Sequence, residues 1–324
     1  MRVLFVTGMH PTPSFPLRGV IIQRLAAALE ATGHEIRWVR LSDQRGPGRY
    51  FKARRLVRQA VTEFRPELVH VHFGYSILAV PRVPVPIVTS FHGDDLNGTR
   101  TEDGGKSLAS RVGILISHYA AWRSRRAIAV SAALRNRLRL ASLRDRTVVV
   151  RDAVDSRLFH PHPRDEARRR LGADPEAFLV LFPHDASQPT KRVGLARAAV
   201  EELKRTVPKA QLWIVNGKPP DEMPWYYSAA DVMLVTSASE GGPSSAKEAL
   251  ACGLSVVSVP VGDVQLLSEV PEHTRMATAD PAALAAAIGS LDLRPGTTGY
   301  LPQFLSLAST AREITEVYRA ATGA

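Results

Sequence analysis

The sequence predicts an α/β protein built from two doubly wound parallel-sheet domains that face a cleft. Three observations lead to this prediction: the length, an alternation of short apolar runs with helical patterns, and one aperiodic segment between two such series. The chain has 324 residues, and a typical domain has about 100–200. The expected strands lie at residues 3–6, 68–71, 87–90, 127–130 and 147–150, and then at 178–181, 211–215, 232–235 and 255–259.

The stretches between these runs have the period of amphipathic helices. Residues 19–32 place Ile22, Leu25 and Leu29 on one face, and residues 195–206 and 281–291 show a similar pattern. Short buried strands that alternate with helices are typical of parallel βαβ units. A last helix, over residues 304–321, is expected to pack back on the first domain.

The segment at residues 152–163 has two prolines and no period, which predicts a boundary between domains. We therefore expect an N-terminal domain at 1–157, a second domain at 158–303 and a C-terminal helix within 304–324. Ligands of doubly wound sheets bind outside the carboxyl ends of the strands, so the functional residues are sought there.

Composition excludes several classes of protein. Lys and Arg number 42 against 31 Asp and Glu, a net charge of +11 that attracts anions. A single cysteine excludes a disulfide framework and a multi-cysteine metal cage. The N-terminal apolar run is shorter than a signal peptide requires, and no run suits a membrane span, so a cytoplasmic protein is expected. No known nucleic-acid-binding module is present, and nucleic acid is not an expected partner.

A basic cluster at residues 45–58 mixes arginines with Tyr50 and Phe51 on an amphipathic helix. Such a helix is either a solvated face or a surface that lies on an anionic membrane. Peripheral contact with the inner face of a membrane therefore stays open.

The most informative segment follows the third strand of the second series. Gly241 and Gly242 allow a sharp turn, and Pro243 suits the first position of a helix. The backbone N–H groups of Ser244 and Ser245 would then lie unpaired at the positive end of that helix. This pattern predicts an anion site fit for a diphosphate.

Two glutamates, Glu240 and Glu248, flank this anion site with seven residues between them. Glu240 is expected on the loop and Glu248 on the second turn of the helix. One carboxylate can then accept hydrogen bonds from hydroxyl groups at the sugar end of a ligand, and the other can accept them from the hydroxyl groups of a ribose. The alternative is a glycine-rich turn with two solvated glutamates.

This Glu-x7-Glu element resembles that of retaining nucleotide-sugar glycosyltransferases of the GT-B fold, the group with glycogen-synthase-like and bacterial mannosyltransferase-like members. The resemblance covers almost the whole chain and implies two Rossmann-like domains. It includes the opening from Gly8 to Gly33-His34-Glu35 and the pair His92-Gly93 after a strand. It continues through the runs at 128–131, 154–161, 229–232 and 248–257.

The resemblance implies a role for each matching residue. Catalytic roles fall to His92, Glu240 and Lys191. Donor-binding roles fall to Gly19, His184, Lys191, Arg192, Gly241, Gly242, Pro243, Ser244, Ser245 and Glu248. The acceptor side would be formed by Arg18, His72 and Asp94. No metal and no cofactor are expected; a nucleotide-diphosphate sugar is the co-substrate, and the acceptor is a saccharide, a lipid-linked saccharide or a small natural product.

The sequence departs from the family pattern at three places. The arginine expected after the first strand of the second domain is absent, and His184 is its only substitute, which implies a weaker and pH-dependent phosphate clamp. The strand expected within 216–228 is missing. Asp152-Ala153 replaces the usual Asn-Gly, a change that we assign to hinge geometry rather than to chemistry.

Two further groups of residues could suggest a metal site, but each has a simpler structural explanation. His70 and His72 share one strand face, but no third ligand is apparent, so a zinc site is not expected. Asp94 and Asp95 are interpreted as a turn, not as a metal site. The missing arginine motivates another function on the same fold, a non-catalytic nucleotide-sugar-binding or partner protein. A sugar-nucleotide epimerase is a further alternative.

Overall fold

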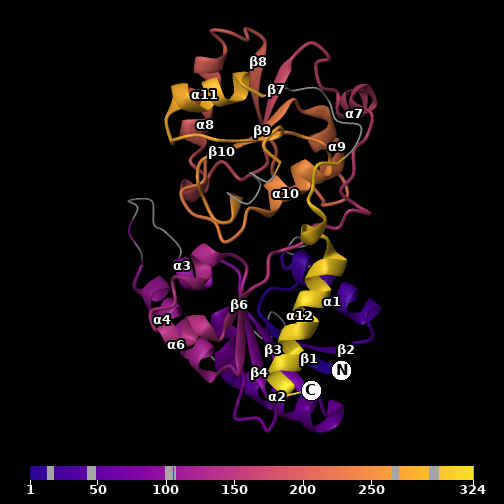
Figure 1. Cartoon of the computed structure of the whole chain (residues 1–324), viewed down its shortest axis with the longest axis vertical. Coiled ribbons are helices and arrows are strands. Elements are labelled where there is room, and N and C mark those ends of the chain that lie inside the picture. Colours follow the sequence, from indigo (N-terminus) through magenta and orange to yellow (C-terminus); the bar gives the residue numbers. More distant parts are fainter. Residues whose placement is uncertain are drawn as a thin grey trace. The chain divides into compact units, whose positions relative to one another are not determined.

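The computed structural model describes residues 1–12, 18–41, 49–98, 105, 107–264, 270–291 and 299–323 (Figure 1). The chain divides into two compact units. Unit 1 comprises Met1–Asp152 together with Leu307–Ala324, and unit 2 comprises Ala153–Ser306. Of the basic cluster predicted at 45–58, residues 45–48 lie outside the described residues.

Unit 1 is built on a parallel sheet of six strands in the order β2-β1-β3-β4-β5-β6. The strands are β1 (Arg2–Thr7), β2 (Glu35–Arg40), β3 (Leu68–His72), β4 (Ile87–Phe91), β5 (Arg126–Ala129) and β6 (Thr147–Val149). The central strands β3 and β4 are buried along their whole length, as apolar parallel strands should be. The sequence did not predict β2, because this edge strand is largely exposed and charged residues interrupt its apolar ones.

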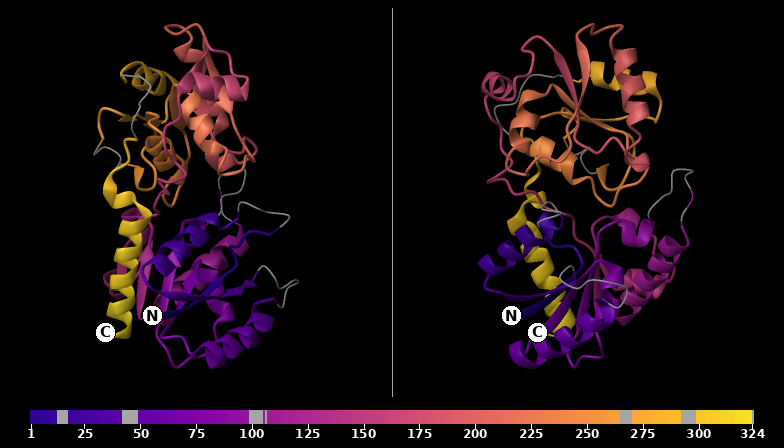
Figure 2. Two further views of the ribbon diagram at one scale, coloured as in Figure 1. Left: turned by 90° about the vertical axis from the view of Figure 1, so that its right-hand side faces the viewer. Right: turned by 180° about the vertical axis from the view of Figure 1, so that it is seen from behind.

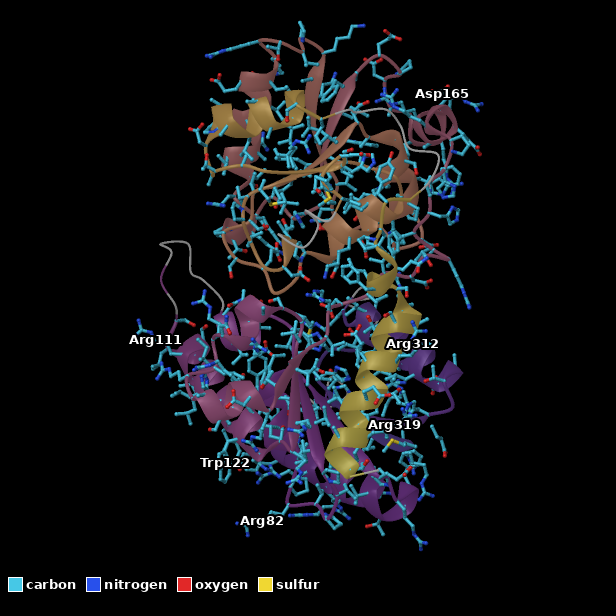
Figure 3. All side chains as sticks on the ribbon, in the orientation of Figure 1. Arg82, Arg111, Trp122, Asp165, Arg312 and Arg319 are labelled. Carbon is cyan, nitrogen blue, oxygen red and sulfur yellow. The ribbon has the colours of Figure 1, made fainter. Side chains whose placement is uncertain are left out.

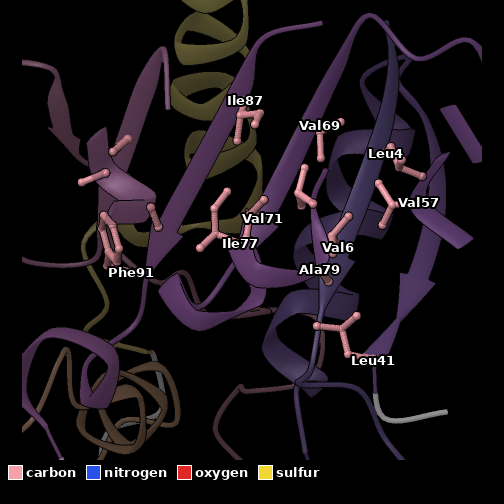
Figure 4. Packing of buried hydrophobic residues seen from close by; sticks show 14 of the residues in the cluster. Leu4, Val6, Leu41, Val57, Val69, Val71, Ile77, Ala79, Ile87 and Phe91 are labelled. Carbon is pink, nitrogen blue, oxygen red and sulfur yellow. The ribbon is translucent and has the colours of Figure 1, made fainter. Parts of the chain in front are cut away.

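Helices cover both faces of this sheet. The helices of unit 1 are α1 (Val20–Ala31), α2 (Arg49–Phe64), η2 (Gly74–Ala79), α3 (Asp94–Asn97), α4 (Leu108–Arg123), α5 (Ala132–Arg135), α6 (Ala141–Asp145) and α12 (Leu307–Thr322). On one face, Leu4, Val6 and Val71 of the sheet pack with Val57 of α2 and Ile77 of η2 (Figure 4). This face therefore buries a continuous aliphatic core.

The last helix, α12, closes the other face of the same sheet. Its Ile314 and Tyr318 pack with Val3 and Phe5 of β1 and with Leu29 of α1. Both views of Figure 2 show α12 running along the strands of unit 1. The predicted return of the C-terminal helix to the first domain is confirmed.

Gly19 is fixed by the backbone at the start of α1. It has a φ of 72°, and a Cβ on it would lie 2.2 Å from the Met9 carbonyl oxygen. Gly19→Ala is therefore expected to lower the unfolding free energy by about 3 kcal/mol, through left-handed strain and a backbone clash. Chemical denaturation measures the effect. Gly194→Ala, in open space on a helix, is the matched control and should not destabilise; equal midpoints for the two variants would contradict the assignment.

Unit 2 is built on a parallel sheet of five strands in the order β11-β10-β9-β7-β8. The strands are β7 (Phe178–Phe182), β8 (Ala210–Ile214), β9 (Val232–Val235), β10 (Val256–Ser258) and β11 (Thr274–Met276). The helices are α7 (Arg164–Leu171), η3 (Pro189–Lys191), α8 (Val193–Leu203), α9 (Met223–Ala229), α10 (Ser244–Ala251), α11 (Pro281–Gly289) and η5 (Gln303–Leu305). The four expected strands are present, and the short edge strand β11 was not predicted.

Residues 215–231, all of which the structure describes, contain α9 but no strand. The prediction that this shortened segment lacks a strand is thus confirmed. Within the described part of the chain, no helix is both long and apolar enough to cross a membrane.

Candidate active site

The strand order in the sheet of unit 2 reverses between β7 and β9, which makes this place the switch point of the sheet. The chain runs from β7 outward to β8 and returns to β9 on the opposite side of β7. Loops that leave neighbouring strands in opposite directions make room for a ligand at their carboxyl ends. The loops at 183–192 and 236–243 therefore flank the expected binding position.

Hydrogen bonds join these two loops. Thr236 Oγ1 donates to the carbonyl oxygen of Lys191 at 2.7 Å. The Arg192 guanidinium donates to the carbonyl oxygens of Thr236 and Ser237 at 2.5 and 3.1 Å. Arg192, predicted to bind the donor, thus holds the loop that leads to Glu240, and its direct contact with a donor stays a prediction.

An ion pair links the predicted catalytic residues of unit 2. Lys191 Nζ lies 2.5 Å from Glu240 Oε1, and the two side chains are only 17% and 15% exposed. At such a site a unit charge at about 4 Å interacts by roughly 4 kcal/mol before desolvation costs. A diphosphate at this position would offer the ammonium group a second anion.

The helix α10 begins one residue later than predicted, because Pro243 is its N-cap and not its first residue. The Pro243 carbonyl accepts from the N–H groups of Ala246 and Lys247 at 3.1 and 3.4 Å. The N–H groups of Ser244 and Ser245 precede these bonds and lie at the positive end of the helix. Such a position can bind an anion, and anion binding by these two groups stays a prediction.

Gly242, the second of the two glycines before α10, is required by close packing. Neither Gly241 nor Gly242, both described, has a positive φ. A Cβ on Gly242 would lie 3.1 Å from Asp263 Oδ1. Glycine at this position therefore lets the loop pass directly over the Asp263 carboxylate.

A buried ion pair that the sequence analysis missed lies beneath this loop. Lys247 Nζ is 2.7 Å from Asp263 Oδ2, and the side chains are 1% and 2% exposed. Lysine is almost never fully buried unless it is paired. The signal was a lysine between Ala246 and Ala249 on the inward face of α10, which predicts an acidic partner but not its position.

Glu248 lies on the second turn of α10, as predicted. The buried Tyr227 hydroxyl donates to Glu248 Oε2 at 3.0 Å. Burial, and then the charge of Glu248, raise the pKa of Tyr227 well above its ordinary value, so the phenol remains a donor. Tyr227 therefore fixes the orientation of the carboxylate.

His184 lies just after β7. Burial, and secondarily the charge of Lys191, lower its pKa to about 3. The imidazole is therefore neutral near neutral pH, and the pH-dependent clamp inferred from the sequence is not expected there. Among the described residues, His184 Nε2, Ser237 Oγ and Asp263 Oδ1 are buried without a hydrogen-bond partner. These atoms follow β7, β9 and β10, on the side where a ligand is expected.

In unit 1, the predicted catalytic His92 follows β4 directly. Its Nε2 lies 3.3 Å from His72 Nδ1, and its ring stacks on Phe73 with centroids 4.7 Å apart. His92 Nδ1 lies 3.8 Å from Asp152 Oδ1. The assignment of Asp152 to hinge geometry alone is thus incomplete, because its carboxylate is next to a predicted catalytic imidazole.

His72 is not at the surface, contrary to the acceptor-side role predicted for it. Its side chain is fully buried between His70 and His92, and its ring centroid lies 4.6 Å from that of Phe5. Side chains at alternate positions of β3 point to the same face, which explains why the His70 and His72 rings are neighbours. His72 therefore packs against the His92 ring from the buried side and helps to fix its position.

The pair Asp94–Asp95 begins the single helical turn α3, and its two carboxylates lie in different environments. Asp94 is exposed, whereas Asp95 is fully buried. The Asp95 carboxylate accepts the backbone N–H groups of Gly74, His92 and Gly93 at 3.2, 3.2 and 3.0 Å. Asp95 therefore anchors the loop that carries His92, a role that the sequence analysis did not assign.

The remaining acceptor-side candidate, Arg18, is exposed and precedes Gly19 at the start of α1. Among the described residues, no group of three or more His, Cys, Asp or Glu side chains is arranged to hold a metal ion.

The histidine cluster makes unit 1 sensitive to acid. Burial, and then the charge of His92, lower the pKa of His70 to about 3 from an ordinary value of 6.5. The unfolded chain binds this proton more tightly, so stability falls as the pH drops below about 6.5. At about pH 5 the loss from His70 is about 2 kcal/mol relative to pH 7. His70→Gln should flatten the dependence of the denaturation midpoint on pH over this range; a slope equal to that of the wild type would refute the assignment.

Comparisons with known proteins agree with this architecture. Residues 18–158 match the model "Glycosyltransferase Family 4", and residues 185–292 match the model "Glycosyl transferases group 1". A D-inositol 3-phosphate glycosyltransferase of Acidothermus cellulolyticus is 32% identical over 187 residues, which are 47% of this chain and 41% of that protein. The chain thus aligns with less than half the length of this curated relative.

Solved structures share the fold over almost the whole chain. Sucrose-phosphate synthase from Thermosynechococcus elongatus superposes with a TM-score of 0.78 at 17% identity, covering 98% of both chains. The Anabaena protein HepE, in complex with UDP and glucose, superposes with a TM-score of 0.65 at 16% identity, covering 99% of this chain and 97% of that one.

Two parallel α/β units with loops gathered at a strand-order switch define a protein of the GT-B fold. The two matched models assign the chain more narrowly. It belongs to the GT-B glycosyltransferases.

Proposed function

We propose that the chain is a retaining, metal-independent glycosyltransferase that moves a sugar from a nucleotide-diphosphate sugar to an acceptor hydroxyl. The observation that carries the proposal is the Lys191–Glu240 pair, 2.5 Å apart, on two loops at the switch point of unit 2. The start of α10 follows in the same loop and supplies the N–H groups of its first turn. This combination suits a sugar attached to a diphosphate.

Each group has a distinct task in this proposal. Lys191 and the N–H groups of Ser244 and Ser245 hold the diphosphate. Glu240 accepts hydrogen bonds from the hydroxyl groups of the sugar, and Glu248 accepts hydrogen bonds from those of the ribose. That HepE holds UDP in the same fold supports a nucleotide as the ligand.

The reaction needs stabilisation of a leaving phosphate. The bond between the anomeric carbon and the phosphate oxygen breaks, the acceptor oxygen bonds to that carbon from the same face, and the acceptor proton passes to the leaving phosphate. Lys191 and the positive end of α10 stabilise the negative charge as it develops. His92, backed by His72 and Asp152, is proposed to act on the acceptor side.

The test is turnover of UDP-, GDP-, ADP- and dTDP-sugars in EDTA, with saccharide and lipid-linked acceptors. The expected result is nucleotide release that requires an acceptor, with a product whose anomeric configuration by NMR equals that of the donor. Nucleotide binding without turnover would favour the non-catalytic alternative, and a new sugar nucleotide formed from the donor alone would favour an epimerase. An inverted product, or a requirement for a divalent cation, would overturn the retaining or metal-independent part.

A further inference from the structure

The helix α4 in unit 1 exposes a continuous apolar stripe. Its five members recur at alternating spacings of four and three residues, and they are Leu108, Val112, Leu115, Tyr119 and Trp122, with exposed fractions of 78, 46, 58, 45 and 64%. At about 100° per residue they fall within an arc of about 80°. The buried residues of the helix, Ser117, Ala120 and Ala121, lie on the opposite side.

This stripe is unusual for a surface helix. Single exposed apolar side chains are ordinary, but a contiguous row of large ones marks an interaction site. Tyr119 and Trp122 stack with ring centroids 5.9 Å apart at one end of the row. Tyrosine and tryptophan are the side chains that favour the boundary between lipid and water.

The surroundings of the stripe are strongly basic. Residues 107–150 contain nine arginines and a single acidic residue, Asp145. Arg111 lies at the edge of the stripe, and Figure 3 shows Arg111 and Trp122 projecting outward from α4. The Arg139 backbone N–H donates to His118 Nε2 of α4 at 3.3 Å, which brings the exposed Leu140 beside the same helix.

We propose that this α4 face, the stripe with its flanking arginines, docks unit 1 on an anionic lipid bilayer. Apolar side chains would enter the boundary between headgroups and acyl chains while the arginines meet lipid phosphates. The spacing of the stripe also suits pairing with a second copy. Charge argues against that occupant, because pairing would bring two arginine-rich surfaces together.

A hollow adjoins this face. It has a volume of about 740 Å³, and its lining includes Tyr50, Tyr75 and Ile116 together with Leu108 and Val112 of the stripe. The apolar face thus continues inward from the helix. A bilayer docked on α4 would place acyl chains next to this hollow.

The test is co-sedimentation of the full chain with vesicles of phosphatidylcholine, with and without phosphatidylglycerol. Binding is expected only to the vesicles that contain phosphatidylglycerol, to weaken as salt is added, and to shift the tryptophan emission to the blue. Leu115→Ser/Trp122→Ser should weaken binding by about tenfold or more, because two exposed side chains lose their contact with lipid. Both positions are exposed, so the fold should tolerate the change.

The matched control is Phe51→Ser/Leu56→Ser on α2, the basic helix for which membrane contact was left open from the sequence. Phe51 and Leu56 are 72% and 38% exposed. This variant should bind as the wild type does. The proposal is overturned if the wild type ignores the anionic vesicles, if the α4 variant binds undiminished, or if only the α2 variant loses binding. A dimer in sedimentation velocity that the α4 variant abolishes would also overturn it. Vesicle binding does not depend on sugar transfer, so its failure is distinct from failure of the proposed function.

Discussion

Lys191→Met is expected to lower the rate of donor cleavage by about 100- to 1,000-fold, the usual effect of removing one group that stabilises a developing oxyanion. The ammonium is the side-chain cation that lies 2.5 Å from Glu240 on the loop after β7. His184, which replaces the expected arginine, has a pKa of about 3 and stays neutral, so it cannot supply the missing charge. The measurement is single-turnover release of the nucleotide, with the enzyme in excess over the donor and at a saturating concentration.

The control for this prediction is Lys204→Met, which removes an exposed lysine paired with Glu201 at 2.8 Å in the same unit. It should leave the rate unchanged, since exposed pairs contribute little. A Lys191→Met protein that cleaves the donor as fast as the Lys204→Met protein would remove Lys191 from the mechanism.

Lys247→Met is expected to destabilise unit 2 by about 3–5 kcal/mol, because it leaves the Asp263 carboxylate buried without its cation. The side chains of this pair are 1% and 2% exposed, and Asp263 Oδ1 has no hydrogen-bond partner. The loop through Gly242 passes directly over the same carboxylate. Denaturant unfolding monitored by circular dichroism gives the change in free energy.

Two further variants isolate the charge effect. Lys247→Met/Asp263→Asn removes both charges and should recover much of the lost stability. Lys209→Met breaks an exposed ion pair with Glu176, whose side chains are 64% and 74% exposed, and should change stability by less than about 0.5 kcal/mol. If Lys247→Met unfolds at the same midpoint as Lys209→Met, the buried pair does not support the loop.

The sequence was sufficient for the parts of the fold that local chemistry specifies. Buried strands such as β3 and β9 are short apolar runs, and no other element gives that pattern between helices. The edge strand β2 was missed because exposure frees it from an apolar pattern. The edge strand β11 was missed because it has only three residues, and two of them are a threonine and an arginine. The Glu240 and Glu248 positions follow from local spacing around one helix start, and so they were predictable.

Contacts between distant segments were not predictable in the same way. Asp263 lies 16 residues from Lys247. Asp152 meets His92 only because the segment after β6 and the segment after β4 come together in space. The sequence shows a charged residue in each case but not its partner. The stripe on α4 was overlooked because its spacing also fits a core helix, and only exposure separates the two possibilities.

The most direct test of the account is thermal unfolding of the full chain with UDP, GDP, ADP, dTDP or CMP, each in EDTA and at high concentration. A nucleotide present at about 100 times its dissociation constant adds about 2.7 kcal/mol to the stability of the state that binds it. At least one nucleoside diphosphate is expected to raise the melting temperature, and Lys191→Met is expected to remove this shift. No shift with any nucleotide, or an equal shift in the Lys191→Met protein, would contradict a diphosphate site at Lys191 and the start of α10.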